Sequence, residues 1–242
     1  MSGGVRATPE IVIPRRFRGP QASGNGGYTC GVVAELVPAD IVEVTLRLPP
    51  PLETPLAVER DGDSVRVRDG DRLVAEGRPA RLDLDPPAPP TFAEAERLAA
   101  AQPADPDHPF PGCFVCGPAR EPGDGLALRP APAGDGLVAA PWRPAGDLEG
   151  ERFAWAALDC PGAFAVMGDF SRGISVLGRL TARALDAPRA GDELVVVGWP
   201  AGEEGRKRYA GTALYRGDDL LASAMAVWIM VDSDLRDDAK PL

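Results

Sequence analysis

Apolar side chains dominate one stretch of the chain, residues 153–168 (FAWAALDCPGAFAVMG), where Asp159 is the sole charge. A helix that is apolar on every side is normally wrapped by other structure. Pro161 removes one backbone donor and predicts a kink or an end just past Asp159. A lone buried carboxylate is costly unless it is paired, hydrogen-bonded or protonated. Two interpretations follow: Asp159 braces the kink, or it works at the edge of a pocket.

A second apolar stretch lies in the first half of the chain, at residues 19–39 (GPQASGNGGYTCGVVAELVPA), and also carries one charge, Glu35. Its glycines and Asn25 predict a loop. Residues 28–37 are long enough for a short helix that stops before Pro38. Each half of the chain therefore offers a mostly apolar helix with a single carboxylate.

Strand-like patterns fill most of the remaining sequence. Asp69-Gly70 between alternating apolar residues predicts a hairpin. Residues 91–101 predict a short helix inside a proline-rich linker, because Thr91 and Glu94 have the spacing of a capping box. The expected strands are 10–17, 42–48, 56–60, 64–84 broken at the hairpin, 136–142, 175–185, 193–199, 208–215 and 220–231.

The two halves resemble a repeat. RDGDRLVAEG at 68–77 matches YRGDDLLASA at 215–224, and the same order of helix and antiparallel strands surrounds both. We therefore predict an internal duplication. Its N-terminal unit would span residues 1–88 and its C-terminal unit 109–242, with a linker and its short helix at 89–108.

Composition excludes several classes of protein. The formal net charge of −10 over 242 residues argues against a nucleic-acid partner. The polar N-terminus and the lack of a long apolar run predict a cytoplasmic protein with no membrane partner. The single histidine, His108, lies in the proline-rich linker, a poor position for a Ser-His-Asp or Cys-His mechanism.

The four cysteines are too few and too unevenly spread for a secreted disulfide scaffold. Cys113-x-x-Cys116 could bind zinc or act as a redox pair, but a zinc site needs about four ligands. Only His108 and Cys160 could complete the set, and nothing in the sequence brings them close. The sequence therefore predicts a structural turn here, with no metal and no cofactor.

Three segments together resemble the hotdog-fold acyl-CoA thioesterase superfamily. They are CFVCGPAREPGDGLAL (113–128), a following strand that ends at Trp142, and AWAALDCPGAFAV (154–166). GNGGYTCGVVAEL (24–36) is similar to the Gly-Gly start of the central helix in the same superfamily. The resemblance implies an α+β double hotdog, in which two central helices are each wrapped by a curved antiparallel β-sheet.

The resemblance also implies an activity, hydrolysis of an acyl thioester such as acyl-CoA. Asp159 would be the general base or nucleophile. Gly26, Gly27 and Tyr28 would bind the substrate and supply the backbone oxyanion hole. Trp155 is a further substrate-binding candidate; for its side chain and that of Tyr28, core packing is the alternative.

The family's carboxylate usually lies about eight residues after the oxyanion glycine. Glu35 stands eight residues after Gly27 and is the second catalytic candidate, whereas the residue eight before Asp159 is Glu151. This departure suggests that the first half supplies the oxyanion hole and the second supplies Asp159, or that one or both sites have been lost.

The sequence leaves open a second function and the pairing of two chains. A non-catalytic protein that binds acyl thioesters or acyl chains on the same fold is the alternative function. In addition, an exposed sheet edge would allow two chains to pair as a homodimer.

Overall fold

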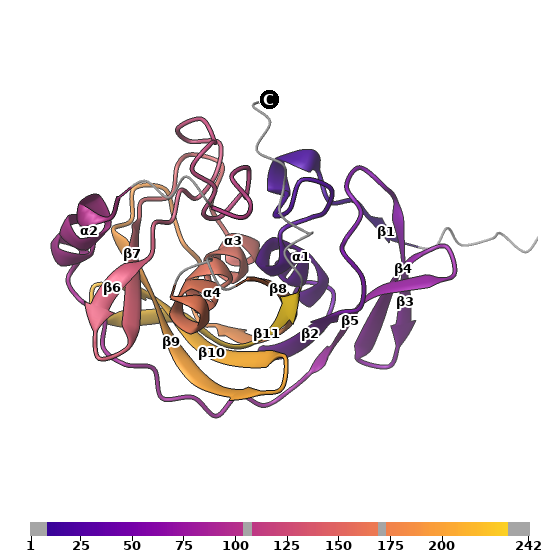
Figure 1. Ribbon diagram of the computed structural model, residues 1–242. Helices are drawn as coiled ribbons and strands as arrows, with labels where there is room; N and C mark the ends of the chain where they lie inside the picture. The colour runs from indigo at the N-terminus through magenta and orange to yellow at the C-terminus, as the bar shows by residue number, and fades with distance from the viewer. Residues whose placement is uncertain (1–8, 104–107, 169–172, 232–242) are drawn as a thin grey trace, which may run out of the picture.

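The computed structural model describes residues 9–103, 108–168 and 173–231. Within these residues, one eleven-stranded antiparallel sheet curves around three of four α-helices, which lie on its concave side (Figure 1). The helices are α1 (Gly26–Ala34), α2 (Phe92–Ala101), α3 (Glu151–Ala157) and α4 (Cys160–Met167), and a 3₁₀ turn spans Arg15–Phe17. The strands are β1 (Glu10–Ile11), β2 (Ile41–Leu46), β3 (Leu56–Asp61), β4 (Ser64–Asp69), β5 (Arg72–Pro79), β6 (Ala131–Gly134), β7 (Leu137–Trp142), β8 (Ile174–Ala184), β9 (Leu194–Glu204), β10 (Lys207–Arg216) and β11 (Asp219–Val231).

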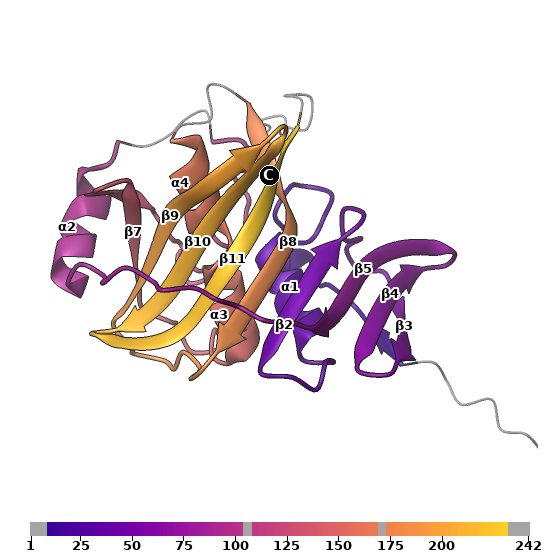
Figure 2. The same ribbon diagram turned by 90° about the horizontal axis from the view of Figure 1, so that it is seen from below.

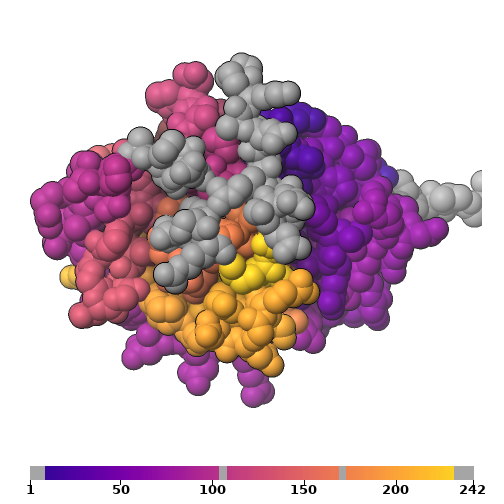
Figure 3. Space-filling view, viewed as in Figure 1, coloured from indigo at the N-terminus to yellow at the C-terminus, as the bar shows by residue number. Residues whose placement is uncertain are grey.

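The strand order is nearly symmetric about its middle. It runs β1-β3-β4-β5-β2 and then β8-β11-β10-β9-β7-β6. Strands β2 and β8 join the two parts and pair antiparallel from Ile41 with Arg183 to Thr45 with Arg179. The sheet is therefore continuous across the two halves of the sequence, which lie side by side in the space-filling view (Figure 3).

The predicted break in the second apolar helix is confirmed. Helix α3 ends at Ala157, and α4 begins at Cys160 with Pro161 in its first turn. Pro161 has no N–H to donate and its ring would clash with the carbonyl four residues earlier, yet it suits a first helical turn. The break interrupts the helical hydrogen bonds at this point. The Thr212 hydroxyl donates to the Leu158 carbonyl at 2.9 Å and so gives this carbonyl a partner.

Helix α1 begins earlier than the sequence pattern predicts. Asn25 is its N-cap, because the Asn25 side-chain oxygen accepts a hydrogen bond from the Tyr28 amide at 2.9 Å. The helix ends at Ala34, short of the predicted end at residue 37. Asn25 therefore starts the helix where the sequence analysis placed it in a loop.

The first predicted strand, residues 10–17, is wrong over most of its length. Glu10–Ile11 forms a short strand with β3, Ile13 makes an isolated bridge with Leu52, and residues 15–17 form the 3₁₀ turn. Pro14 directly precedes that turn and cannot donate to a strand ladder, which explains why the strand does not continue.

The linker helix α2 forms as predicted. The Thr91 hydroxyl accepts a hydrogen bond from the Glu94 amide at 3.2 Å. The preceding segment, 80–91, runs along the outer face of the sheet to reach it (Figure 2). Ala95 of α2 packs with Ala139 and Val197 on that outer face, so α2 covers the sheet from the side opposite to α1, α3 and α4.

Helices α1 and α3 meet at two glycines of α1. A Cβ atom on Gly27 would lie 2.5 Å from the Asp159 Cβ, and one on Gly31 would lie 2.9 Å from the Arg152 Cα. Only glycine allows backbones to approach this closely. One hydrophobic core continues around this contact through both halves of the sheet.

Candidate active site

Asp159 lies at the junction of α3 and α4 and faces the N-terminus of α1. Its Oδ2 atom accepts hydrogen bonds from the Asn25 side-chain amide at 2.7 Å and from the Gly27 backbone amide at 3.0 Å. The residue is 3% exposed, and its Oδ1 atom is buried with no hydrogen-bond partner in the described part of the chain. One carboxylate oxygen is thus anchored and the other is left unpaired.

Burial raises the pKa of Asp159 to about 7, because water no longer stabilises the charged form. The hydrogen bond from Gly27 acts in the opposite direction, the nearby Cys113 sulfur raises the pKa further, and the Asn25 amide lowers it. The partial positive charge at the N-terminus of α1 also favours a carboxylate at this place.

Asp159 lines a cavity of about 600 Å³ between the two halves. Segments 19–26, 46–50 and 108–116 contribute to its wall, together with α4, β8 and β11. Aromatic and aliphatic side chains form much of the lining: Leu46, Leu48, Phe110, Phe164, Leu177, Trp228 and Ile229. A largely apolar cavity with a few polar groups is the usual form of a small-molecule site.

Gly26, Gly27 and Tyr28 lie at the start of α1 as expected, but two of their amides are already used. The Gly27 amide donates to Asp159 and the Tyr28 amide donates to Asn25. Gly26 lines the cavity, and within the described residues no backbone hydrogen bond from its amide is found. The first amide of the helix is therefore the one that a ligand could use.

The side chains of Tyr28 and Trp155 lie in the core, outside the cavity lining. The Tyr28 ring stacks on Phe17 with centroids 3.9 Å apart. Trp155 is 2% exposed, and its Cβ lies against Gly31 where α1 and α3 meet. Both side chains hold the two halves together.

The second predicted carboxylate, Glu35, is not brought to the same site. It follows the last residue of α1 and forms a two-pronged ion pair with Arg152, at 2.9 and 2.6 Å. Glu35 is absent from the cavity lining. Its single charge is therefore balanced by a partner that stands 117 residues away in the sequence.

Sequence reasoning placed His108 in a linker and missed its position. The side chain is 9% exposed and lines the cavity, with its ring 6.2 Å from that of Phe164. Its Nδ1 atom accepts a hydrogen bond from the Phe110 amide at 3.1 Å. One feature of the sequence could have indicated this position: His108 stands five residues before Cys113, next to the C-x-x-C segment that begins the second half. Asn25, which holds Asp159, was also missed as a site residue.

The structure brings Cys160 close to Cys113 and Cys116, a proximity that nothing in the sequence indicates. The three sulfur atoms lie within 4.8 Å of one another beside Asp159, and all three residues line the cavity. Cys160 is the first residue of α4, so the same break that places Asp159 also places this thiol.

Helices held on the concave side of a curved antiparallel sheet, with a cavity at the junction of two halves, define a hotdog-fold protein. A hotdog-fold protein of unknown function from Alicyclobacillus acidocaldarius superposes with a TM-score of 0.60 at 13% identity, over 92% of this chain and 91% of that chain. No protein-family model and no curated protein sequence matches the chain.

Two further solved structures share the fold. A protein proposed to be a thioesterase, from Novosphingobium aromaticivorans, has a TM-score of 0.60 at 13% identity and covers 92% of this chain and 94% of that chain. A protein proposed to be a thioesterase II, from Thermobifida fusca, has a TM-score of 0.53 at 17% identity and covers 93% and 96%. Identities this low establish a common fold. In the described part of the chain no helix is long and apolar enough to cross a membrane.

Proposed function

We propose that this protein hydrolyses acyl thioesters, with acyl-CoA as the substrate class, and that Asp159 activates the attacking water. The observation that carries the proposal is the state of the Asp159 carboxylate. One oxygen is fixed by Asn25 and Gly27, and the other has no hydrogen-bond partner among the described residues, on a side chain that lines a largely apolar cavity. A carboxylate held in this way is oriented for general-base chemistry.

The reaction follows from the positions of Asp159 and Gly26. The thioester carbonyl oxygen would approach the Gly26 amide, at the positive end of α1, and water would stand at the Asp159 Oδ1 atom. Asp159 takes a proton as the water oxygen bonds to the carbonyl carbon, and the Gly26 amide stabilises the oxyanion. The carbon–sulfur bond then breaks, and the proton passes from Asp159 to the departing thiolate, giving a carboxylic acid and a thiol.

A second candidate function is non-catalytic binding of an acyl thioester or acyl chain. One observation favours it: the Gly27 and Tyr28 amides are occupied by Asp159 and Asn25, which leaves a single helix amide for an oxyanion. If the protein only binds its ligand, it should form a tight complex with an acyl thioester and not hydrolyse it.

The proposed site needs both halves of the chain, and we infer that these are two hotdog units, 1–88 and 109–242, joined by the linker 89–108. The support is the symmetric strand order and a shared irregularity in the matching hairpins. Pairing of β4 with β5 shifts register between Val67 and Arg68, and pairing of β10 with β11 shifts between Leu214 and Tyr215. Both shifts stand at the same distance before the turn glycines Gly70 and Gly217, each with φ 56°. A duplication explains this coincidence.

The test is hydrolysis of short, long and aromatic acyl-CoAs, followed by chromatography of the released CoA. Asp159→Asn keeps the size of the side chain and the acceptor for Gly27 but removes the base. Loss of a general base costs about 10²–10⁴ in rate. Glu35→Gln is the matched control, because it alters the other predicted carboxylate outside the cavity, and it should leave turnover unchanged.

Three outcomes would contradict the proposal. Asp159→Asn with wild-type turnover and an intact fold would remove Asp159 from the mechanism. A loss confined to Glu35→Gln would assign the chemistry to the other half. Binding without turnover by the wild-type protein across the whole panel would favour the acyl-binding function.

A further inference from the structure

We propose that Cys113, Cys116 and Cys160 form a binding site for one thiophilic divalent metal ion, of the class of Zn²⁺. The proposal goes beyond thioester hydrolysis and rests on the three thiols alone. The sequence argued against a metal because nothing brought Cys160 to the other two cysteines, and the fold removes that objection.

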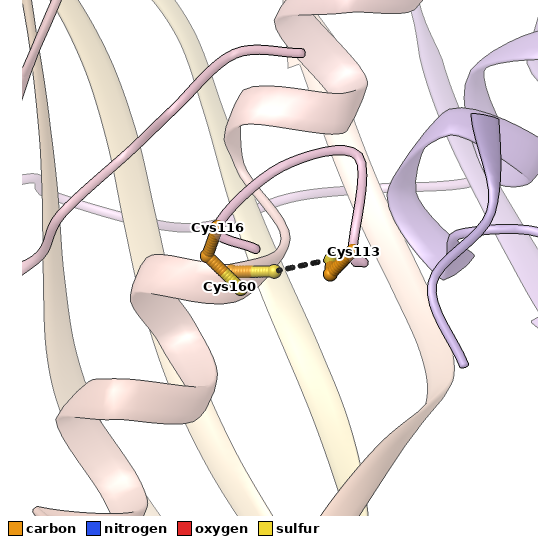
Figure 4. A group of neighbouring side chains, drawn as sticks. All are labelled: Cys113, Cys116 and Cys160. Carbon is orange, nitrogen blue, oxygen red and sulfur yellow. Dashed lines mark hydrogen bonds between the residues drawn. The ribbon is translucent and has the colours of Figure 1, made fainter. Parts of the chain in front are cut away.

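The sulfur atoms already have the spacing that such an ion requires. All three lie within 4.8 Å of one another, and the Cys113 and Cys160 sulfurs are 3.8 Å apart. A tetrahedral zinc ion with Zn–S bonds of about 2.3 Å holds two thiolates about 3.8 Å apart. The loop that carries Cys113 and Cys116 arches over the start of α4, and the three side chains point toward a common centre (Figure 4). The four cysteines of the chain are free thiols.

The turn that carries the first two cysteines is closely packed. The Gly117 amide donates to the Cys113 carbonyl at 2.9 Å. A Cβ on Gly117 would lie 2.4 Å from the Cys113 nitrogen and 2.5 Å from the Pro111 carbonyl oxygen. Only glycine fits there, so the C-x-x-C-G sequence fixes a backbone that turns both sulfurs to one side.

An N–H donor lies beside one sulfur of the cluster. The Asn25 side-chain amide lies 3.8 Å from the Cys113 sulfur. Such an N–H contact stabilises a thiolate, the form that binds metal, and orients it as outer-shell groups do in metal sites.

The cluster also leaves a ligand position open. All three cysteines line the cavity, and the group of close ligand atoms among the described residues consists of these three thiols. Three protein ligands with a fourth position open to a cavity is an arrangement in which zinc binds an exogenous ligand. A bound ion would also tie the turn of residues 113–117 to the start of α4, and so fix the junction that holds Asp159.

The experiment is a titration of the reduced, metal-free protein with Co²⁺, which reports thiolate ligands through a charge-transfer band and tetrahedral geometry through its visible d–d bands. We expect one equivalent of Co²⁺ per chain, displaced by one equivalent of Zn²⁺. Cys116→Ala and Cys160→Ala should each abolish the charge-transfer band at stoichiometric metal. Cys30→Ala is the matched control, since Cys30 is a fully buried thiol outside the cluster, and it should bind as the wild type does.

A second measurement on the wild-type protein does not depend on the folding of any variant. Bound Zn²⁺ should protect Cys113, Cys116 and Cys160 from alkylation, as read by peptide mass spectrometry, and a chelator should restore their reaction. The proposal is overturned if reduced protein with four titratable thiols binds no Co²⁺. It is equally overturned if the charge-transfer band survives in both cluster variants, or if Zn²⁺ leaves the alkylation of all three thiols unchanged. The readouts are metal binding and thiol protection, so they stand apart from hydrolytic activity.

Discussion

The Gly27 backbone amide donates a hydrogen bond to the Asp159 Oδ2 atom at 3.0 Å, although the two residues are 132 positions apart in the sequence. This bond joins the first turn of α1 to the break between α3 and α4. The start of one apolar helix therefore binds the lone carboxylate of the other, and the candidate site takes residues from both halves.

The close approach at Gly27 predicts a large cost for adding one methyl group. In Gly27→Ala the new Cβ would lie 2.5 Å from the Asp159 Cβ and 2.7 Å from the Trp155 carbonyl oxygen, so α1 and α3 must separate. Overpacking of this kind typically costs about 1–3 kcal/mol. We expect that loss in the free energy of unfolding, measured by urea denaturation. Gly146→Ala is the control, since no atom of the described residues lies within 4 Å of its Cβ position. Equal stabilities for the two variants would show that the helices do not meet as described.

Asn25 has two tasks, and its removal should cost more than the loss of a helix cap. Asn25→Ala deletes the N-cap of α1 and also the buried hydrogen bond to Asp159. A cap alone is worth about 1 kcal/mol, and the loss of one of the two hydrogen bonds to Asp159 Oδ2, which keeps its bond from Gly27, costs about 0.5–1.5 kcal/mol more. Thr91→Ala is the matched control because it removes the exposed side-chain cap of α2. Thermal and urea unfolding should separate the two variants; a loss no larger than that of Thr91→Ala would contradict the role of Asn25 in holding Asp159.

The Glu35–Arg152 pair should contribute little to stability despite its two short contacts. Both side chains are partly exposed, at 35% and 41%, so water screens the attraction. A double-mutant cycle with Glu35→Gln and Arg152→Met should give a coupling free energy of about 1 kcal/mol or less. A coupling several times larger would mean that the pair holds α1 to α3 as strongly as the glycine contacts do.

One shared core predicts that the two halves stay together when the chain is cut between them. The β2–β8 ladder and the α1–α3 contact both cross from one half to the other, and neither involves residues 103–108. We therefore expect that protein cleaved at a protease site inserted between residues 103 and 108 elutes as one species from a sizing column without denaturant. Separation of the two fragments under those conditions would refute a common core.

Local sequence features determined the elements of this protein. Pro161 set the break beside Asp159, Thr91 and Glu94 set the start of α2, and the Asp69-Gly70 pair set a hairpin with glycine at positive φ. Each of these signals acts within a few residues, through a missing N–H, a side-chain cap or a backbone angle, and can therefore be seen in the sequence itself.

The tertiary structure alone decided which of these elements meet. The pairing of Asp159 with Asn25, the ion pair that occupies Glu35, the entry of His108 into the cavity wall and the approach of Cys160 to Cys113 each join separate elements of the fold. Their geometry depends on how the sheet closes around the helices, a sum of many weak packing contacts that no short stretch of sequence encodes. The sequence thus named the carboxylate, and the packing of the two halves gave it one bound and one unpaired oxygen.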